Sequence, residues 1–278
     1  MRMPLDRPRV SVIVSTYNRP DALRAVLDGL NAQTHGDFEV IIADDGSGKE
    51  TRDMLQEIRE RLPYPLIHIW QRDKGFRAAK ARNKAVAASR GEYLIFLDGD
   101  CIPFPNFIEE HLRLAEPKWF VRGNRVMLSE SFTQWVLENE AGVTQFRYYE
   151  FVKHRMRGNI KRMVPLLHLP LGPVRKIVAK KWQGAKTCNL GVLKSDFMNL
   201  NGFDERYIGW GHEDADLVVR LIRSGIYRKE GNFSIPVLHL WHKMNDRSQL
   251  EKNEKRLQNA LINDHIKAEQ GISQYIDG

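Results

Sequence analysis

The sequence predicts an α/β fold: a mostly parallel sheet with helices on both faces. Two observations support this prediction. Over the first 126 residues, short β-branched runs alternate with helical patterns, and repeated β-α-β order implies a parallel sheet. Polar clusters follow three of the predicted strands, and ligands of Rossmann-like sheets bind at the carboxyl ends of the strands.

The elements of this first part follow from hydrophobic periodicity. Leu23, Val26, Leu27 and Leu30 have the i, i+3, i+4, i+7 spacing of an amphipathic helix, and Pro20 suits its first turn. Apolar residues mark a second helix over 54–62, and an Ala-rich stretch marks a third over 77–89. Strands are expected at 10–15, 38–43, 66–70 and 93–97.

The second part is less regular. Residues 127–185 contain prolines that interrupt the apolar pattern, so we expect a helical, basic insertion there. A strand over 189–194, a helix over 213–223 that Gly225 stops, and a strand over 234–240 follow. We therefore divide the chain after residue 126 and again after residue 245, where a helical tail (246–278) begins.

Positive charge is concentrated in one stretch. The net charge is +8, yet residues 151–195 contain no Asp or Glu, and acids outnumber bases elsewhere. Such a stretch indicates an anionic partner, for example a membrane surface or an acidic glycolipid, or else a solvated face. Its basic residues are Lys153, Arg155, Arg157, Lys161, Arg162, Arg175, Lys176, Lys180, Lys181, Lys186 and Lys194.

The cellular compartment is suggested by what the sequence lacks. It has no apolar run long enough to span a membrane, and Met1–Val10 has no apolar core of a signal peptide. Cys101 and Cys188 are too few for a disulfide framework. We expect a reduced, cytoplasmic protein that associates with the inner face of the cell membrane if the basic stretch binds lipid.

Asp98 and Asp100 flank Gly99 directly after the fourth predicted strand. Residues two apart in extended backbone lie on the same side, and Gly99 leaves room for a ligand to approach closely. Two carboxylates on one side suit Mg²⁺ or Mn²⁺, which would also bind phosphate oxygens. A surface turn is the alternative, because Asp-Gly pairs are common in turns.

Acidic pairs occur at two further places. Asp44 and Asp45 follow the second strand, where an acid of a Rossmann-like fold often binds ribose, or where side chains stabilise a turn. Glu213 and Asp214 open a helix, a position that acids favour in any protein. Asp216 adds a third acid to that turn, and such crowding raises a carboxylate pKa toward that of a useful base.

Three residues with aromatic rings, one tryptophan and two histidines, are further candidates for the site. Trp210 stands between two glycines, which predicts an exposed, mobile aromatic of the kind that stacks on sugars. His239 and His242 lie near the last predicted strand, where one of them could bind a metal or pack in the core. Their spacing is not that of a zinc site.

Several segments, in order, resemble family 2 glycosyltransferases of the GT-A fold. The resemblance covers about 10–126 and 184–242, and the second part is similar to the carboxyl-terminal half of galactosyltransferase-like and chondroitin-polymerase-like enzymes. It rests on VSVIVSTYNR (10–19), IADDGS (42–47), GFRAAKARN (75–83), FLDGD (96–100), NGFDE (201–205) and GWGHED (209–214).

The resemblance implies that residues 1–126 are the nucleotide-sugar-binding half of one domain, that 127–245 are its acceptor-binding half, and that the basic insertion lies on the acceptor side. It also implies a role for each matching residue. Asp100 would bind the metal with His239 or His242. Asp214 would be the catalytic base, and Glu213 would contact the acceptor beside it. The acceptor would also meet Trp210, Gly211 and His212, although His212 stands where some relatives carry glycine. The nucleotide, commonly UDP in such enzymes, would be held by Thr16, Tyr17, Asn18, Arg19, Asp44, Asp45, Arg77, Arg82, Asp98 and Gly99.

These roles predict an inverting, metal-dependent glycosyltransferase that moves a sugar from a nucleotide-diphosphate donor to a glycan or glycolipid hydroxyl. The Q-x-x-R-W motif of processive polysaccharide synthases is absent, so we expect addition of a single sugar. The donor sugar, the acceptor and the linkage are not defined by the sequence.

Two other classes of function remain. A nucleotidyltransferase of a related fold would also use carboxylates and a metal, but it usually carries a Gly-rich basic loop after the first strand, which Thr16-Tyr17-Asn18-Arg19 is not. A nucleic-acid-binding protein would use the basic stretch and leave the ordered acids unexplained, so we expect no nucleic-acid partner. The motifs of P-loop ATPases, dinucleotide-binding dehydrogenases, zinc proteases and serine hydrolases are absent.

Overall fold

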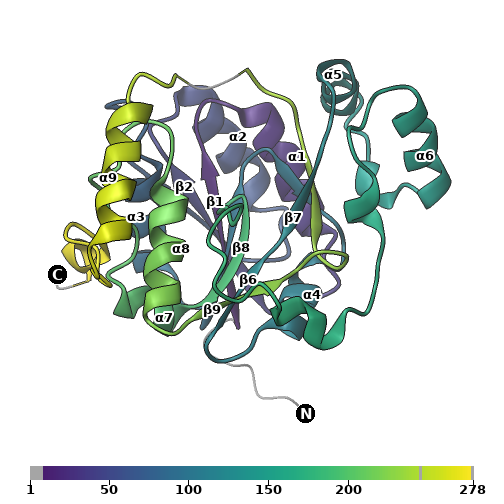
Figure 1. The fold of residues 1–278 in the computed structure, drawn as a ribbon. Helices are drawn as coiled ribbons and strands as arrows, with labels where there is room; N and C mark the ends of the chain where they lie inside the picture. The colour runs from purple at the N-terminus through teal and green to yellow at the C-terminus, as the bar shows by residue number, and fades with distance from the viewer. Residues whose placement is uncertain (1–8, 244–245, 277–278) are drawn as a thin grey trace, which may run out of the picture.

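A computed structural model describes residues 9–243 and 246–276. Its main sheet has the strand order β3-β2-β1-β4-β8-β6-β9, in which only β8 runs antiparallel to its neighbours, so the predicted, mostly parallel α/β fold is confirmed (Figure 1). The strands are β1 (Val10–Thr16), β2 (Phe38–Asp44), β3 (Leu66–Trp70), β4 (Tyr93–Asp98), β5 (Cys101–Pro103), β6 (Trp119–Arg122), β7 (Asn124–Met127), β8 (Asn189–Leu193), β9 (Tyr227–Glu230) and β10 (Pro236–His239).

Helices cover both faces of this sheet. Alternate residues of β1 show why: Val12 and Val14 belong to one core, and Ile13 belongs to the other, because successive side chains of a strand point to opposite faces. α1 and α2 pack on the first face, and α3 and α8 pack on the second. The helices are α1 (Pro20–Asn31), α2 (Lys49–Arg59), α3 (Ala78–Ala88), α4 (Phe107–Leu114), α5 (Glu130–Glu138), α6 (Tyr148–Met156), α7 (Lys194–Asn199), α8 (Glu213–Arg223) and α9 (Leu250–Ile262).

A second, smaller sheet with the order β5-β10-β7 was not predicted. β10 pairs antiparallel with β5, so that His239 lies opposite Cys101, and the Leu240 amide donates to the Asp100 carbonyl at 2.9 Å. This pairing joins segments far apart in the chain. It therefore brings the end of β10 to the residues that follow β4.

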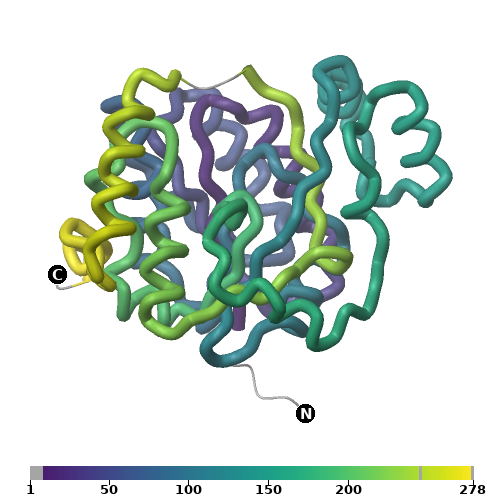
Figure 2. Tube along the Cα trace, in the orientation of Figure 1, coloured from purple at the N-terminus to yellow at the C-terminus, as the bar shows by residue number. Residues whose placement is uncertain are grey.

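The predicted insertion contains α5, α6 and short 3₁₀ turns at Val143–Gln145, Val164–Leu166 and Gly172–Lys176. Figure 2 shows α5 and α6, which Figure 1 labels, at the side of the molecule opposite the C-terminal tail. In the described residues no helix is both long and apolar enough to cross a membrane. Three parts of these predictions lie outside the described residues: Met1–Pro8, which the signal-peptide argument used, residues 244–245 at the end of the predicted acceptor-binding half, and residues 277–278 at the end of the predicted tail.

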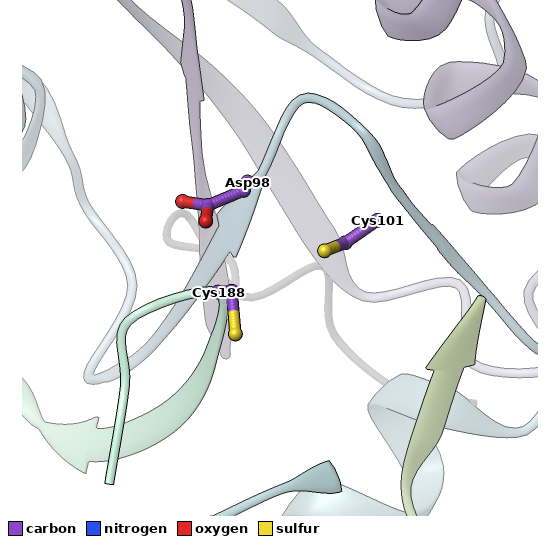
Figure 3. A group of neighbouring side chains, drawn as sticks. All are labelled: Asp98, Cys101 and Cys188. Atoms are coloured by element: carbon purple, nitrogen blue, oxygen red, sulfur yellow. The ribbon is translucent and has the colours of Figure 1, made fainter. Parts of the chain in front are cut away.

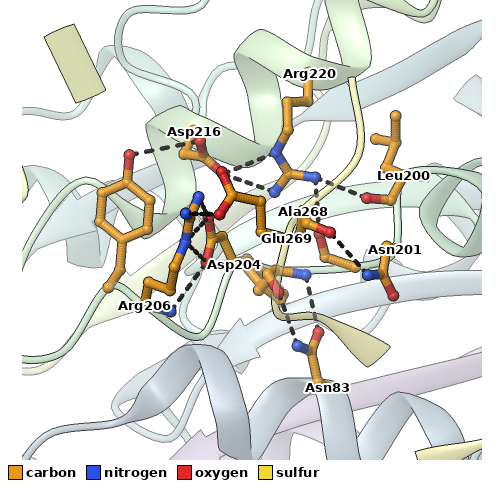
Figure 4. Close-up of polar contacts among 12 residues, drawn as sticks. Asn83, Leu200, Asn201, Asp204, Arg206, Asp216, Arg220, Ala268 and Glu269 are labelled. Atoms are coloured by element: carbon orange, nitrogen blue, oxygen red, sulfur yellow. Dashed lines mark hydrogen bonds and ion pairs between the residues drawn. The ribbon is translucent and has the colours of Figure 1, made fainter. Parts of the chain in front are cut away.

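Two arginines form ion pairs beside α8, one of them with the C-terminal tail, and we call this group the tail network (Figure 4). Arg220 binds Asp216 at 2.7 Å and donates to the Leu200 and Gly202 carbonyls. Arg206 pairs with Asp204 at 2.6 Å and with Glu269 of the tail. Asp216, the third acid of the crowded turn, therefore belongs to this network and points away from the other two.

Candidate active site

A cavity of about 360 Å³ opens at the carboxyl ends of β1 and β4, the edge at which the sequence predicts ligand binding. Most of the predicted site residues contribute to its wall, although they come from distant parts of the chain. Its lining residues are Ser15, Thr16, Tyr17, Ala43, Asp45, Phe76, Ala78, Arg82, Asp98, Arg125, Met127, Lys186, Cys188, Trp210, Glu213, Asp214, His239 and His242.

Arg82 connects the acids of this cavity. Its buried guanidinium lies 3.0 Å from Asp98, 3.3 Å from Glu213 and 3.7 Å from Asp214. The Ser15 hydroxyl donates to Asp98 at 2.9 Å. We call Arg82 and its three acids the active-site network; it sets one cation against three carboxylates.

Glu213 and Asp214 are the first two residues of α8, and both line the cavity. Burial and the neighbouring Asp214 carboxylate together raise the pKa of Glu213 to about 7, against the opposing effect of Arg82. The Thr187 hydroxyl donates to Asp214 Oδ1 at 2.5 Å. His212, directly before the pair, has φ of +74°, a conformation that glycine adopts at lower cost.

Asp100, His239 and His242 form a cluster at the cavity. His239 Nε2 and His242 Nε2 lie 3.7 and 3.5 Å from the two Asp100 oxygens, and the three ligand atoms lie within 4.8 Å of one another. These separations are too long for hydrogen bonds but suit atoms that share one cation. The sequence left His239 and His242 as rivals, and the structure brings both to Asp100.

The electrostatics of this cluster also fit a divalent cation. Burial raises the pKa of Asp100, and neighbouring Asp98 adds to the shift against the effect of His239. Burial has the opposite effect on His239, whose pKa it lowers, because in both cases the neutral form is favoured. A metal requires the neutral imidazole. His239 Nδ1 is also buried without a hydrogen-bond partner. A carboxylate with two imidazoles is a donor set for Mn²⁺ or a similar ion.

Asp98 also lies close to the two free cysteines, as Figure 3 shows. Cys101 begins β5 and Cys188 precedes β8, and their sulfurs and an Asp98 oxygen lie within 4.8 Å of one another. Burial raises the pKa of the Cys101 thiol well above its usual value. Because a thiol must ionise to bind metal, we interpret this pair as packing beneath Asp98.

The acidic pair after β2 is divided between two roles. Asp45 lines the cavity, and its carboxylate accepts from Gln71 at 2.7 Å and from the Arg77 amide at 2.5 Å. Asp44 points to the other side, where it accepts from the Gly46 and Ser47 amides and lies 2.8 Å from His68. Its carboxylate is therefore engaged in the turn, which was the alternative weighed from the sequence.

Other residues predicted to hold the nucleotide also differ in position. Thr16 and Tyr17 line the cavity, and the buried Thr16 hydroxyl has no partner. Asn18 accepts from the Gly48 amide instead, and Arg19 pairs with Asp21 at the surface. Neither of these two lines the cavity.

The glycines and aromatics of the site are more tightly packed than expected. A Cβ on Gly99 would lie 2.8 Å from the Ser15 carbonyl, and on Gly211, which has φ of +111°, 3.0 Å from Leu250. Gly99 therefore permits close packing of the chain on β1. Trp210 is half-buried rather than exposed, with the Arg247 guanidinium 4.8 Å above its ring. The Arg77 guanidinium donates to the Arg72 carbonyl.

Several residues of the site were not predicted from the sequence. Thr187, which donates to Asp214, does not line the cavity itself, and a threonine before a cysteine in an irregular segment fits no motif. Among the lining residues, Arg125 lies outside the basic stretch, and Lys186 lies within it but was not assigned to the site. The remaining lining residues that were not predicted are Ser15, Ala43, Phe76, Ala78, Met127 and Cys188.

Comparison with known families matches both halves of the chain. A family model described as glycosyl transferase family 2 matches residues 11–166. A second, described as N-terminal domain of galactosyltransferase, matches residues 178–240. The order of the two matches agrees with the order of the motifs in the sequence.

Curated relatives show the same affiliation. Validoxylamine A glucosyltransferase of Streptomyces hygroscopicus subsp. jinggangensis is 30% identical over 240 residues, covering 79% of this chain and 52% of its own length. Chondroitin synthase of Escherichia coli is 25% identical over 228 residues, covering 78% of this chain and 33% of its own length. The chain spans about half or less of the length of these relatives.

Solved structures share the fold. A mannosyltransferase from Pyrobaculum calidifontis, in complex with GDP-Man and Mn²⁺, aligns with a TM-score of 0.62 at 16% identity, over 93% of this chain and 64% of its own. S. aureus TarS 1–349 in complex with UDP aligns with a TM-score of 0.60 at 14% identity, over 96% and 68%. Because the first family model covers more than half of the sequence, the chain belongs to glycosyltransferase family 2.

Proposed function

We propose that the protein is an inverting, metal-dependent glycosyltransferase that moves one sugar from a nucleotide-diphosphate donor, UDP-linked in our preferred form, to an acceptor hydroxyl. The observation that carries this proposal is the convergence of Asp98, Arg82 and Asp214 on one cavity, with Asp100 next to the two histidines of its wall. Family membership supports sugar transfer in general, and the relatives' substrates are not assumed for this chain.

The donor would lie along the carboxyl ends of β1 and β4. Asp45 and Thr16, both on the cavity wall, would meet the nucleoside. Asp100, His239 and His242 would hold Mn²⁺ or Mg²⁺, which when bound neutralises the charge of the diphosphate leaving group. Arg82 keeps Asp98 in place on the same side.

Asp214 would remove the proton of the acceptor hydroxyl as the oxygen attacks the anomeric carbon. Thr187 donates to one carboxylate oxygen of Asp214, so that the other remains for the acceptor. Glu213, with its pKa near 7, would contact the acceptor, and Trp210 would form one wall of its site. A single displacement inverts the configuration at the anomeric carbon.

A panel of UDP- and GDP-sugars tests the donor and the metal together, because solved structures of this fold hold either nucleotide. We expect Mn²⁺-dependent thermal stabilisation by one nucleotide class and release of that nucleoside diphosphate. Asp100→Asn should abolish the Mn²⁺ dependence, whereas Asp53→Asn, at an exposed acid paired only with Lys49, should not. Release of pyrophosphate instead would identify a nucleotidyltransferase and contradict the proposal.

We also propose that the insertion docks on an anionic membrane. Nine of the sixteen exposed large apolar side chains in the described residues lie within 148–177, in or beside the stretch that lacks acids. Tyr148, Val152 and Met156 follow one another at i, i+4, i+8 along α6, so they form one exposed face beside Lys153. An exposed apolar face flanked by cations is typical of interfacial helices.

Co-sedimentation with vesicles tests this docking. Binding should be stronger to anionic than to neutral vesicles, and Met156→Glu should weaken it. Ile262→Glu is a matched control, because Ile262 is 79% exposed against 83% for Met156 but lies on α9, at the other side of the molecule (Figure 1). Equal binding to both vesicle types would contradict this proposal and leave the transferase proposal intact.

A further inference from the structure

A second pocket, of about 490 Å³, adjoins the cavity of the active site. Arg125, Met127, Lys186 and Cys188 line both spaces, so the two share a wall. Its size lies within the range of small-ligand sites. The complete lining is Arg122, Gly123, Asn124, Arg125, Met127, Lys161, Arg162, Gly184, Lys186 and Cys188, and we call it the cationic pocket.

Positive charge in this pocket is compensated only in part by the protein. The charges of Asp98 and Asp100 act on the Arg125 guanidinium without forming an ion pair with it. Arg122 pairs with Glu230 at 3.5 Å. By contrast, the side chains of Arg125, Lys161, Arg162 and Lys186 have no carboxylate within ion-pair distance in the part of the chain that the structure describes. None of the lining residues is acidic. Four like charges around one space repel one another, and an anionic ligand would relieve that repulsion.

The backbone links this pocket to the proposed base. Lys186 lines the cationic pocket, and the next residue, Thr187, holds Asp214. Consecutive Cα atoms are only about 3.8 Å apart. An acidic group bound beside Lys186 and a hydroxyl at Asp214 could therefore belong to one sugar unit or to adjoining units of the same acceptor.

The pocket is distinct from the part of the site proposed for the donor diphosphate. Asp100, His239 and His242 do not line it, and Lys161 and Arg162 do not line the active-site cavity. Both of these cations are exposed, so an extended acceptor can reach them from solvent. Guanidinium groups bind phosphate and carboxylate through paired hydrogen bonds.

We propose that the cationic pocket selects an acidic acceptor, one that carries a phosphate or carboxylate group close to the hydroxyl that receives the sugar. This inference rests on the proposed transferase function and names the acceptor class for it. The pocket binds the acid, and the shared wall places the neighbouring hydroxyl in the active-site cavity.

The test measures binding of glucose 1-phosphate, glucuronic acid and neutral glucose to the full chain saturated with UDP and Mn²⁺, by ligand-observed NMR. We expect at least one of the two acids to bind about tenfold or more tightly than glucose and to weaken at high salt. Comparing the two acids separates a phosphate from a carboxylate preference. Arg162→Glu and Lys161→Glu should each weaken that binding about fivefold or more, and Lys180→Glu, with the same charge change at an exposed lysine outside both spaces, should not.

Hydrolysis of the donor sugar nucleotide without acceptor is measured on the same variants and should be unchanged. Equal affinity for all three sugars, or equal loss in Lys180→Glu, would overturn the inference. So would a loss of UDP binding in Arg162→Glu, because the pocket would then serve the donor. If the wild-type protein binds the acids but no UDP- or GDP-sugar stabilises it with Mn²⁺, the transferase proposal fails while the anion pocket stands.

Discussion

The active-site network and the tail network are both built on ion pairs between arginines and carboxylates, and they differ in charge balance. In the tail network each buried aspartate has its own arginine, Asp216 with Arg220 and Asp204 with Arg206. In the active-site network Arg82 alone faces three carboxylates. Asp214 and Asp216 are two residues apart on α8, so they lie on different faces of the helix.

The difference in charge balance indicates that the acids of the tail network stabilise the fold, whereas those of the active-site network are available for chemistry. Arg220 also binds two backbone carbonyls, and the tail network is therefore complete within the protein. The active-site network keeps excess negative charge next to a cavity, which destabilises the fold unless a proton, a cation or a substrate hydroxyl compensates it. Substitutions in the two networks should accordingly affect different properties.

The largest expected effect is that of Asp214→Asn. Transfer should fall about 10²- to 10⁴-fold, the range of general-base catalysis, because an amide cannot accept the acceptor proton. Donor binding, measured as UDP-sugar thermal stabilisation, should persist. Near-normal turnover of this variant would remove Asp214 from the mechanism.

Asp216→Asn should instead reduce stability. It leaves the buried Arg220 guanidinium without its carboxylate, which costs about 3 kcal/mol in the free energy of unfolding. Urea denaturation measures this loss, and turnover per folded molecule should be unchanged. If turnover falls as far as in Asp214→Asn, the two networks are not functionally separate.

Glu213→Gln tests the excess negative charge of the active-site network through the pH dependence of stability. The pKa of Glu213 rises from 4.5 in the unfolded chain to about 7 in the fold. The proton therefore stabilises the folded state fully below pH 4.5, and this stability is lost as pH rises through 7. The substitution should remove roughly 2 kcal/mol of this pH dependence. Denaturation with EDTA at pH 5 and pH 7.5 compares the two proteins, and parallel pH profiles would refute the assignment.

The comparison also shows what the sequence could predict. The strands β1 to β4 and the helices between them were predicted correctly, because local periodicity determines them. The sequence did not predict which member of an acidic pair faces the cavity. Asp44 and Asp45 are adjacent acids that differ only in the direction of their side chains. The meeting of Asp100 with His239 depends on β5 pairing with β10, a contact between distant segments that no local pattern encodes.

The smallest expected effect concerns Thr187, which acts through Asp214 as a positioning residue. Thr187→Val keeps the shape but removes the hydroxyl that donates to Asp214 Oδ1. A hydrogen bond to a charged group contributes about 1.5 kcal/mol, so kcat should fall roughly tenfold with little change in the KM for the donor. Thr187→Ser restores the donor and should recover most of the activity, which a purely structural role in packing would not predict. Equal activities for the Val and Ser variants would mean that the Thr187 hydroxyl has no part in holding the base, and that Arg82 alone positions Asp214.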